Sequence, residues 1–162
     1  MPAIQLINYH PALQPEIDRM MENIQSEFAQ AITSRHSTII EQVYHLPNHR
    51  YWVARCGAEV AGTIGAVLPT RGFTVVKRMM VDRKFRGDAF GTARALMDAA
   101  RDWSLQNGAG EIFLGTMAQF VAAQKFYLKY GFEEIGEKDL PAGYPHNPMD
   151  TVFFRLMPDE SR

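Results

Sequence analysis

The chain has 162 residues, of which 46% are hydrophobic and 22% charged, with a formal net charge of −1. This length fits one domain over residues 1–162, and the composition excludes a disordered chain or a disulfide scaffold. The balanced charge argues against a dedicated binder of nucleic acid or of an anionic membrane, which would carry a basic excess. The single cysteine, Cys56, fits a reducing compartment. With no signal-peptide pattern and no apolar run of roughly 20 residues, we expect a cytoplasmic protein.

The first half of the sequence predicts one strand, two helices and then three strands. Residues 4–9 alternate loosely, as in a strand, and apolar residues recur at intervals of three and four from Leu13 to Ile32, as in an amphipathic helix. A shorter helix is expected over Thr38–Tyr44, before Pro47. Strands are expected at residues 51–55, 60–68 and 73–81. Short turns separate them, which indicates an antiparallel meander.

The second half alternates between strands and helices. A helix is expected from about residue 89 or 90 to Asn107-Gly108, and a second over residues 120–130. Strands are expected at 112–114, 132–135 and 151–156, and the loop 140–148, with three prolines, is a candidate wall for a pocket. Such alternation implies a parallel crossover within a mixed sheet, and therefore an α/β (α+β) fold.

The most informative stretch lies between the strand that ends at Val81 and the helix that follows. Small residues at 87, 89 and 91 let the backbone approach a ligand, and the first amides of the helix suit phosphate groups. Arg83, Lys84 and Arg86 add mobile positive charge, and Thr92 offers a hydroxyl. The stretch lacks the Gly-Lys-Ser or Gly-Lys-Thr of a P-loop and the glycine spacing of a dinucleotide fingerprint. A turn that needs glycines only for its geometry fits the same pattern.

Two motifs resemble those of the GNAT superfamily of N-acetyltransferases. Residues 86–91, Arg-Gly-Asp-Ala-Phe-Gly, look like the family's Arg/Gln-x-x-Gly-x-Gly/Ala loop, with Ala89 where many members have glycine. Residues 126–132 look like its Tyr-x-Lys-x-Gly-Phe type motif. The resemblance covers about the last two-thirds of the chain. It implies a mixed, largely antiparallel sheet of about six to seven strands flanked by about four helices.

The resemblance also implies acetyl-CoA as co-substrate, held where the fourth and fifth strands splay apart, and no metal. Tyr127 matches the tyrosine that protonates the departing thiolate, with Tyr130 as the fallback; alternatively, the Tyr127 ring packs in the core with its hydroxyl satisfied elsewhere. The family often has an asparagine where this chain has Phe120, and Gln119 and Gln124 are nearby amides that could substitute. The expected contacts of acetyl-CoA are Met79, Met80 and Val81 for the pantetheine arm, and Arg86, Gly87, Asp88, Ala89, Phe90, Gly91 and Thr92 for the pyrophosphate. A backbone amide near Met79 is the candidate to polarise the thioester carbonyl.

The general base is left open by the sequence, with Glu41, Glu111, Asp150 and a water chain as candidates. Strand alternation predicts Lys77 and Met79 on one face of their strand, with Arg78 on the other, where it pairs with a carboxylate or faces a cleft. The histidines His36, His45, His49 and His146 lack the spacing of metal ligands.

The leading hypothesis is therefore an N-acetyltransferase that moves an acetyl group from acetyl-CoA to a primary amine of a small molecule or peptide. The expected mechanism is direct transfer in a ternary complex. The expected partners include no nucleic acid and no membrane, and homodimers are common in the family that the chain resembles. A non-catalytic acyl-CoA sensor of the same fold is the main alternative. A nucleotide-phosphate binder that uses the same loop is the third.

Overall fold

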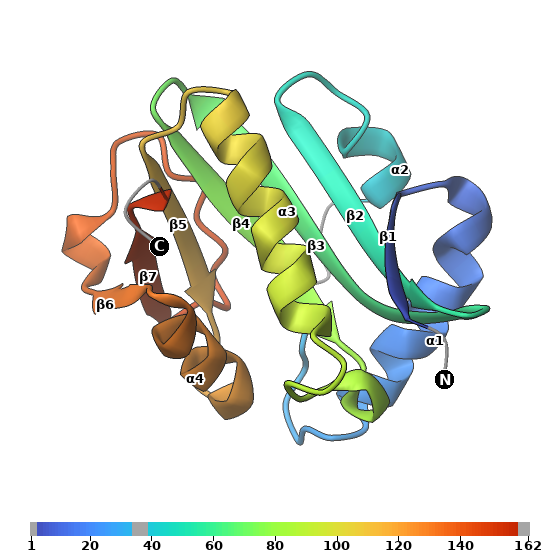
Figure 1. Cartoon of the computed structure of the whole chain (residues 1–162). Coiled ribbons are helices and arrows are strands. Elements are labelled where there is room, and N and C mark those ends of the chain that lie inside the picture. The colour runs from blue at the N-terminus through green and yellow to red at the C-terminus, as the bar shows by residue number, and fades with distance from the viewer. Residues whose placement is uncertain (1–2, 34–38, 159–162) are drawn as a thin grey trace. The chain divides into compact units, whose positions relative to one another are not determined.

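A computed structural model describes residues 3–33 and 39–158 of the chain (Figure 1). Its strands form one mixed sheet in the order β1-β2-β3-β4-β5-β7-β6. They are β1 (Ile4–Asn8), β2 (His49–Cys56), β3 (Glu59–Thr70), β4 (Phe73–Val81), β5 (Glu111–Thr116), β6 (Glu133–Ile135) and β7 (Val152–Leu156). The α-helices within the described residues are α1 (Gln14–Gln25), α2 (Ile40–Val43), α3 (Thr92–Gln106) and α4 (Val121–Tyr130). This mixed sheet with its four helices confirms the fold predicted from the sequence.

The chain divides into two compact units, each made of two stretches of sequence. Unit 1 comprises Met1–Gly65 and Arg78–Ala99, and unit 2 comprises Ala66–Lys77 and Ala100–Arg162. Strands β3 and β4 and helix α3 therefore contribute residues to both units.

Unit 1 contains the antiparallel pair β1 and β2, which runs from Ile4↔Cys56 to Asn8↔Trp52. Helix α1 buries Ile17, Met20 and Ile24, which recur at intervals of three and four, as the sequence predicts. On β3, a Cβ at Gly62 would stand 2.7 Å from the carbonyl oxygen of Met80 and 3.0 Å from Leu96 Cδ1. Only glycine admits this close approach of β4 and α3 to β3.

Helix α1 is shorter than the predicted span of residues 13–32. It ends because the side chain of Gln25 takes over the local hydrogen bonding: its Nε2 donates to Gln30 O (2.9 Å) and its Oε1 accepts from Ile32 N (2.9 Å). Ile32 is still buried, so the apolar repeat correctly marks a core position. The apolar periodicity of the sequence continues past the end of the helix because a loop returns Ile32 to the core.

Unit 2 contains the parallel pair β4 and β5, from Phe73↔Glu111 to Val76↔Leu114. This pair confirms the predicted crossover. Strand β7 pairs antiparallel with both β5 and β6. One core cluster comprises Phe73, Val75, Phe113, Tyr144 and Phe153, with Val67, Ile135 and Leu140 packed against it. The loop 140–148 thus supplies core residues to this unit.

Other element boundaries also move. Helix α3 begins at Thr92 rather than at residue 89 or 90, because Phe90 N and Gly91 N both donate to Gly87 O and form a separate turn. Helix α2 covers only Ile40–Val43 of the expected Thr38–Tyr44, and Thr38 lies outside the described residues. Strands β2, β3 and β5 each extend beyond their predicted ends.

Among residues 3–33 and 39–158, no helix has both the length and the apolar character needed to cross a bilayer. The same residues contain no group of three or more His, Cys, Asp or Glu side chains that could hold a metal ion. His36 lies outside the described residues.

Candidate active site

The loop between β4 and α3 is the first candidate region. A short 3-10 turn, Arg83–Phe85, follows β4, and the buried carboxylate of Asp82 caps it by accepting from Lys84 N (3.1 Å). Gly87 has φ +104° and Gly91 has φ +67°, and no atom would lie within 4 Å of a Cβ at either position. Both glycines are therefore required by backbone conformation, while the space beside them is open.

The start of α3 offers amide groups to this loop. Ala95 N donates to Gly91 O (2.9 Å), and the N–H groups of Thr92 and Ala93 lie before this bond in the first turn. The aligned peptide dipoles of a 15-residue helix add positive potential at that end. An anionic group such as a phosphate is well matched to this arrangement.

Three side chains predicted to face a phosphate are engaged within the protein instead. The buried Thr92 hydroxyl donates to Phe85 O (3.0 Å), so its role is to hold the loop against the helix. Arg86 donates to Glu27 through Nη1 (2.7 Å) and Nη2 (3.0 Å) and to Val81 O through Nε (2.9 Å). Lys84 Nζ lies 2.7 Å from Glu59 Oε2. The expectation of mobile charge at Arg86 and Lys84 does not match these contacts.

Within β4, the predicted alternation fails at Arg78. This residue has φ +55°, in the left-handed region, and its carbonyl accepts from the hydroxyl of Thr63 (2.9 Å). One left-handed residue inside a strand changes the faces to which the following side chains point, as in a β-bulge. The half-buried Met79, Met80 and Val81 therefore do not continue the pattern that begins at Phe73.

The side chain of Arg78 lies beside two buried tyrosines. Burial raises the pKa of Tyr44, and a hydrogen bond from Arg78 and its charge oppose that rise. Burial also raises the pKa of Tyr51, which Arg78 again opposes. A Cβ at Gly65 would stand 2.9 Å from the Tyr44 ring. The sequence predicted that Arg78 pairs with a carboxylate or faces a cleft; the structure also places it in a hydrogen bond with the hydroxyl of Tyr44 and near that of Tyr51.

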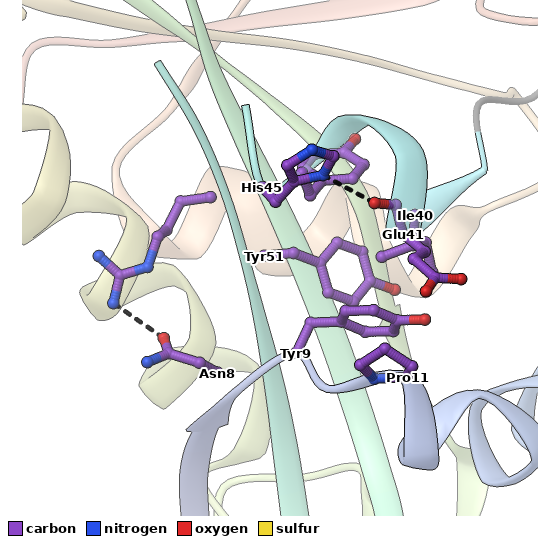
Figure 2. Close-up of a pocket in the computed structure, with 9 residues that line it drawn as sticks. Asn8, Tyr9, Pro11, Ile40, Glu41, His45 and Tyr51 are labelled. Atoms are coloured by element: carbon purple, nitrogen blue, oxygen red, sulfur yellow. Dashed lines mark hydrogen bonds between the residues drawn. The ribbon is translucent and has the colours of Figure 1, made fainter. Parts of the chain in front are cut away.

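A pocket of about 420 Å³ lies in unit 1 (Figure 2). The rings of Tyr9 and Tyr51 meet edge to face with their centroids 5.6 Å apart. His45 Nδ1 lies 2.8 Å from the carbonyl oxygen of Glu41. The residues that line this pocket are Asn8, Tyr9, Pro11, Ile40, Glu41, Tyr44, His45, Arg50 and Tyr51. Glu41 is thus a candidate base that lines an aromatic pocket.

Tyr127 lies on α4 in unit 2, and only 4% of it is exposed. Its ring centroid is 5.5 Å from that of Phe154 and 5.8 Å from that of Phe132. Burial raises the pKa of the Tyr127 hydroxyl, and the charge of Asp150 raises it further. The ring of Tyr127 is therefore packed in the core, as the alternative interpretation of this residue predicts. Its hydroxyl stays protonated at neutral pH.

The residues expected to replace the family's asparagine are also placed by the structure. Phe120 is the N-cap of α4 and provides no side-chain cap. Gln124 Nε2 donates to Met117 O (3.2 Å) and Ala118 O (3.1 Å), and Gln119 Nε2 contacts Met117 Sδ at 3.9 Å. Gln124 therefore fixes the turn before α4. Tyr130, the fallback acid, is buried, with the Arg101 guanidinium 6.0 Å from its ring centroid.

A second cluster in unit 2 surrounds Gly115 of β5. A Cβ at Gly115 would stand 2.7 Å from Asp150 Oδ2 and 3.0 Å from the Tyr144 hydroxyl. Burial raises the pKa of Asp150 to about 6, and the charge of Lys77 acts in the opposite direction. Of the other candidate bases, Glu111 accepts from Arg155 Nε at 2.6 Å. The sequence named Asp150 as one of several candidates but gave no signal for Gly115 or Tyr144.

The model of the acetyltransferase (GNAT) family matches residues 17–132. N-acetylaspartate synthetases are similar in sequence: the Danio rerio protein is 34% identical over 122 residues, covering 72% of this chain and 42% of its own length. The Homo sapiens protein is 36% identical over 122 residues, covering 72% of this chain and 39% of its own length. The chain thus spans about two fifths of the length of these relatives.

Among solved structures, an acetyltransferase of the GNAT family from Staphylococcus aureus superposes with a TM-score of 0.83 at 27% identity. The match covers 94% of this chain and 98% of that one. An acetyltransferase from Streptococcus agalactiae gives a TM-score of 0.82 at 18% identity, covering 97% of this chain and 99% of that one, and supports the fold alone.

Proposed function

The chain belongs to the acetyltransferase (GNAT) family, and on that premise we propose that it transfers an acetyl group from acetyl-CoA to a primary amine. The observation that carries this proposal is the loop at residues 82–91, which is folded onto the first amides of α3 and has two positive-φ glycines in open space. Amides in such a position bind phosphate, and CoA carries a pyrophosphate.

The residues present fit acetyl-CoA. We propose that backbone amides in the loop from Arg86 to Gly91, with the N–H of Thr92, hold the pyrophosphate. Within this loop Phe90 N and Gly91 N donate to Gly87 O, so they close the turn and leave the phosphate contacts to the other amides. The backbone of Met79, Met80 and Val81 would hold the pantetheine arm. The side chains of Arg86 and Thr92 serve this cradle indirectly, because their contacts with Glu27 and Phe85 fix its shape. When bound, acetyl-CoA supplies an acetyl group activated as a thioester.

Tyr127 is the proposed proton donor to the departing thiolate. Its hydroxyl is protonated at neutral pH, and its packed ring fixes the position of the hydroxyl. The transfer is proposed to be direct, within a ternary complex, because the amine nucleophile needs no covalent enzyme intermediate to attack a thioester.

The acceptor is proposed to be a small-molecule amine, and amino acids are the first class to test. The support comes from the relatives, which are named as N-acetylaspartate synthetases. A peptide amine is the second class. The match of the family model to residues in both units supports the proposal that the chain acts as one acetyltransferase domain. We also propose a cytoplasmic location, which fits a sequence whose single cysteine is the buried Cys56.

Calorimetric titration of the purified protein with acetyl-CoA is the first test. We expect micromolar binding at one site per chain. A thiol-release screen over aspartate, glutamate, other amino acids and simple primary amines then identifies the acceptor. Binding without turnover on any amine would favour the acyl-CoA sensor. Absence of binding by a folded protein would overturn the enzyme proposal.

A further inference from the structure

The carboxylate of Asp150 lies against the backbone of β5. Asp150 immediately precedes residues that join β7, since Thr151 N donates to Thr116 O (2.9 Å) and Val152 is paired with Thr116. The Asp150 amide in turn donates to Asn147 O (3.0 Å). The backbone is therefore fixed on both sides of the carboxylate, and the side chain projects from a tethered position.

Gly115 makes room for this carboxylate. The ideal Cβ position of Gly115 is 2.7 Å from Asp150 Oδ2, 3.1 Å from Asp150 Cβ and 3.0 Å from the Tyr144 hydroxyl. Any other residue at 115 would displace one of these groups. Asp150 Oδ2 and the Tyr144 hydroxyl thus both lie within 3.0 Å of the same ideal Cβ position, in a unit whose neighbouring cluster is made of aromatic and aliphatic side chains.

The contact between Asp150 and Gly115 lies at the end of the β4–β5 ladder. The pairs in the described residues run up to Val76↔Leu114, and Lys77 and Gly115 are the next residues of the two strands. Lys77 of β4 and Tyr127 of α4 belong to the same unit as Asp150, and both interact electrostatically with its carboxylate. The carboxylate therefore lies near the hydroxyl that we propose as the proton donor.

We propose that Asp150 is the general base that takes a proton from the ammonium group of the acceptor, while Tyr144 and Gly115 hold its carboxylate in position. This inference rests on the proposed function. The acceptor R–NH₃⁺ gives one proton to the carboxylate and becomes R–NH₂. Its nitrogen attacks the thioester carbonyl carbon, the new C–N bond forms, and the C–S bond breaks. The thiolate sulfur receives a proton from the proton donor, the second proton that leaves the nitrogen restores that donor, and Asp150 releases its own proton to water.

The surroundings of Asp150 suit this role. Its pKa of about 6 makes it a carboxylate at neutral pH, yet a stronger base than an ordinary aspartate. The titratable groups that face it are Lys77 of β4, Tyr127 of α4 and Tyr144 of the loop 140–148. Both tyrosines have raised pKa values and stay neutral, so they do not compete for its proton near pH 6. Asp150 is half-buried, so the residue keeps some contact with solvent.

The test compares wild type with Asp150→Asn in the thiol-release assay from about pH 5 to pH 9, with saturating acetyl-CoA. We expect wild-type kcat/KM to rise with pH to a plateau, with a midpoint near pH 6. Asp150→Asn should lower turnover by about 10²-fold or more and remove this rise, while its acetyl-CoA affinity stays unchanged. Glu134→Gln, an equal charge change at an exposed position of β6, is the matched control and should keep the wild-type profile.

Two further measurements keep the inference independent of folding effects. The carboxyl ¹³C signal of Asp150, followed by NMR, should titrate near pH 6; a midpoint near 4 would contradict the inference. Gly115→Ala should shift that midpoint and lower turnover, because the new methyl group displaces the carboxylate.

The outcomes separate the two proposals. Lack of acetyl-CoA binding, or binding without turnover, by wild type overturns the enzyme proposal and this inference with it. If wild type is active and Asp150→Asn keeps both the rate and the pH profile, only the role of Asp150 is overturned.

Discussion

Arg86 and Glu27 form a two-point ion pair, with Nη1–Oε1 at 2.7 Å and Nη2–Oε2 at 3.0 Å. Glu27 follows the end of α1, and Arg86 opens the Gly-containing loop before α3. The pair therefore ties this loop to a segment far away in the sequence, and the third donor of Arg86, Nε, ties it to the end of β4.

Arg86→Glu should weaken acetyl-CoA binding at least 10-fold. The substitution places two carboxylates opposite each other, shifts the loop, and adds negative charge near the proposed pyrophosphate site. Calorimetry measures the affinity. The exchange variant Glu27→Arg/Arg86→Glu should recover part of the lost affinity. Lys84→Gln, which removes an exposed ion pair with Glu59, should leave stability nearly unchanged. Unchanged affinity in Arg86→Glu would show that this ion pair does not contribute to acetyl-CoA binding.

Gly91→Ala should lower the free energy of unfolding by about 1–2 kcal/mol, because alanine is strained at φ +67° although nothing crowds its methyl group. Denaturant unfolding measures the change. Gly110→Ala is the matched control: its Cβ would also meet open space, and its φ lies outside the left-handed region. Equal stability of the two variants would show that strain at Gly91 does not limit the loop.

Tyr127→Phe should lower kcat by about 10²-fold, since the reaction loses its proposed proton donor. Acetyl-CoA affinity should stay the same, because the ring that packs against Phe132 and Phe154 is retained. Steady-state kinetics and calorimetry measure the two quantities, with Tyr130→Phe as the parallel variant. Full activity of Tyr127→Phe would exclude Tyr127 as the acid.

Asp150 should make folding stability depend on pH in a defined direction. Its folded pKa of about 6 exceeds the ordinary value of 3.8, so the folded state binds the proton more tightly than the unfolded state does. The contribution of this group therefore favours folding below about pH 4 and is lost as pH rises through about 6. The melting temperature of Asp150→Asn minus that of wild type should increase between these two pH values. A constant difference, measured by calorimetry, would contradict the raised pKa.

The sequence predicted those features that depend on local pattern. The meander of β2, β3 and β4, the crossover to β5 and the loop before α3 all follow from residue type and spacing over short stretches. The end of α1 did not follow, because it depends on hydrogen bonds from one side chain, Gln25, to residues beyond the helix. The sequence likewise did not predict the positive φ of Arg78, since arginine has no preference for that conformation.

The sequence did not predict the cluster at Gly115 for a different reason. It forms because the register of β5 and β7 brings Gly115 opposite Phe153, which places Asp150 and Tyr144 beside it. Such a register depends on long-range pairing, and no local motif encodes it. Asp150 could only be named as one of several carboxylates, whereas the ion pair that engages Glu111 became visible only in the folded chain.

The backbone of Arg78 is left-handed, with φ +55°. This conformation costs a residue with a Cβ about 1–2 kcal/mol that glycine does not incur. Variants of this protein selected for heat resistance alone would therefore be expected to acquire glycine at position 78. Variants selected for turnover would be expected to retain arginine if its guanidinium, beside Tyr44 and Tyr51, serves the reaction. The residue recovered at position 78 under each regime would separate the demands of folding from those of chemistry.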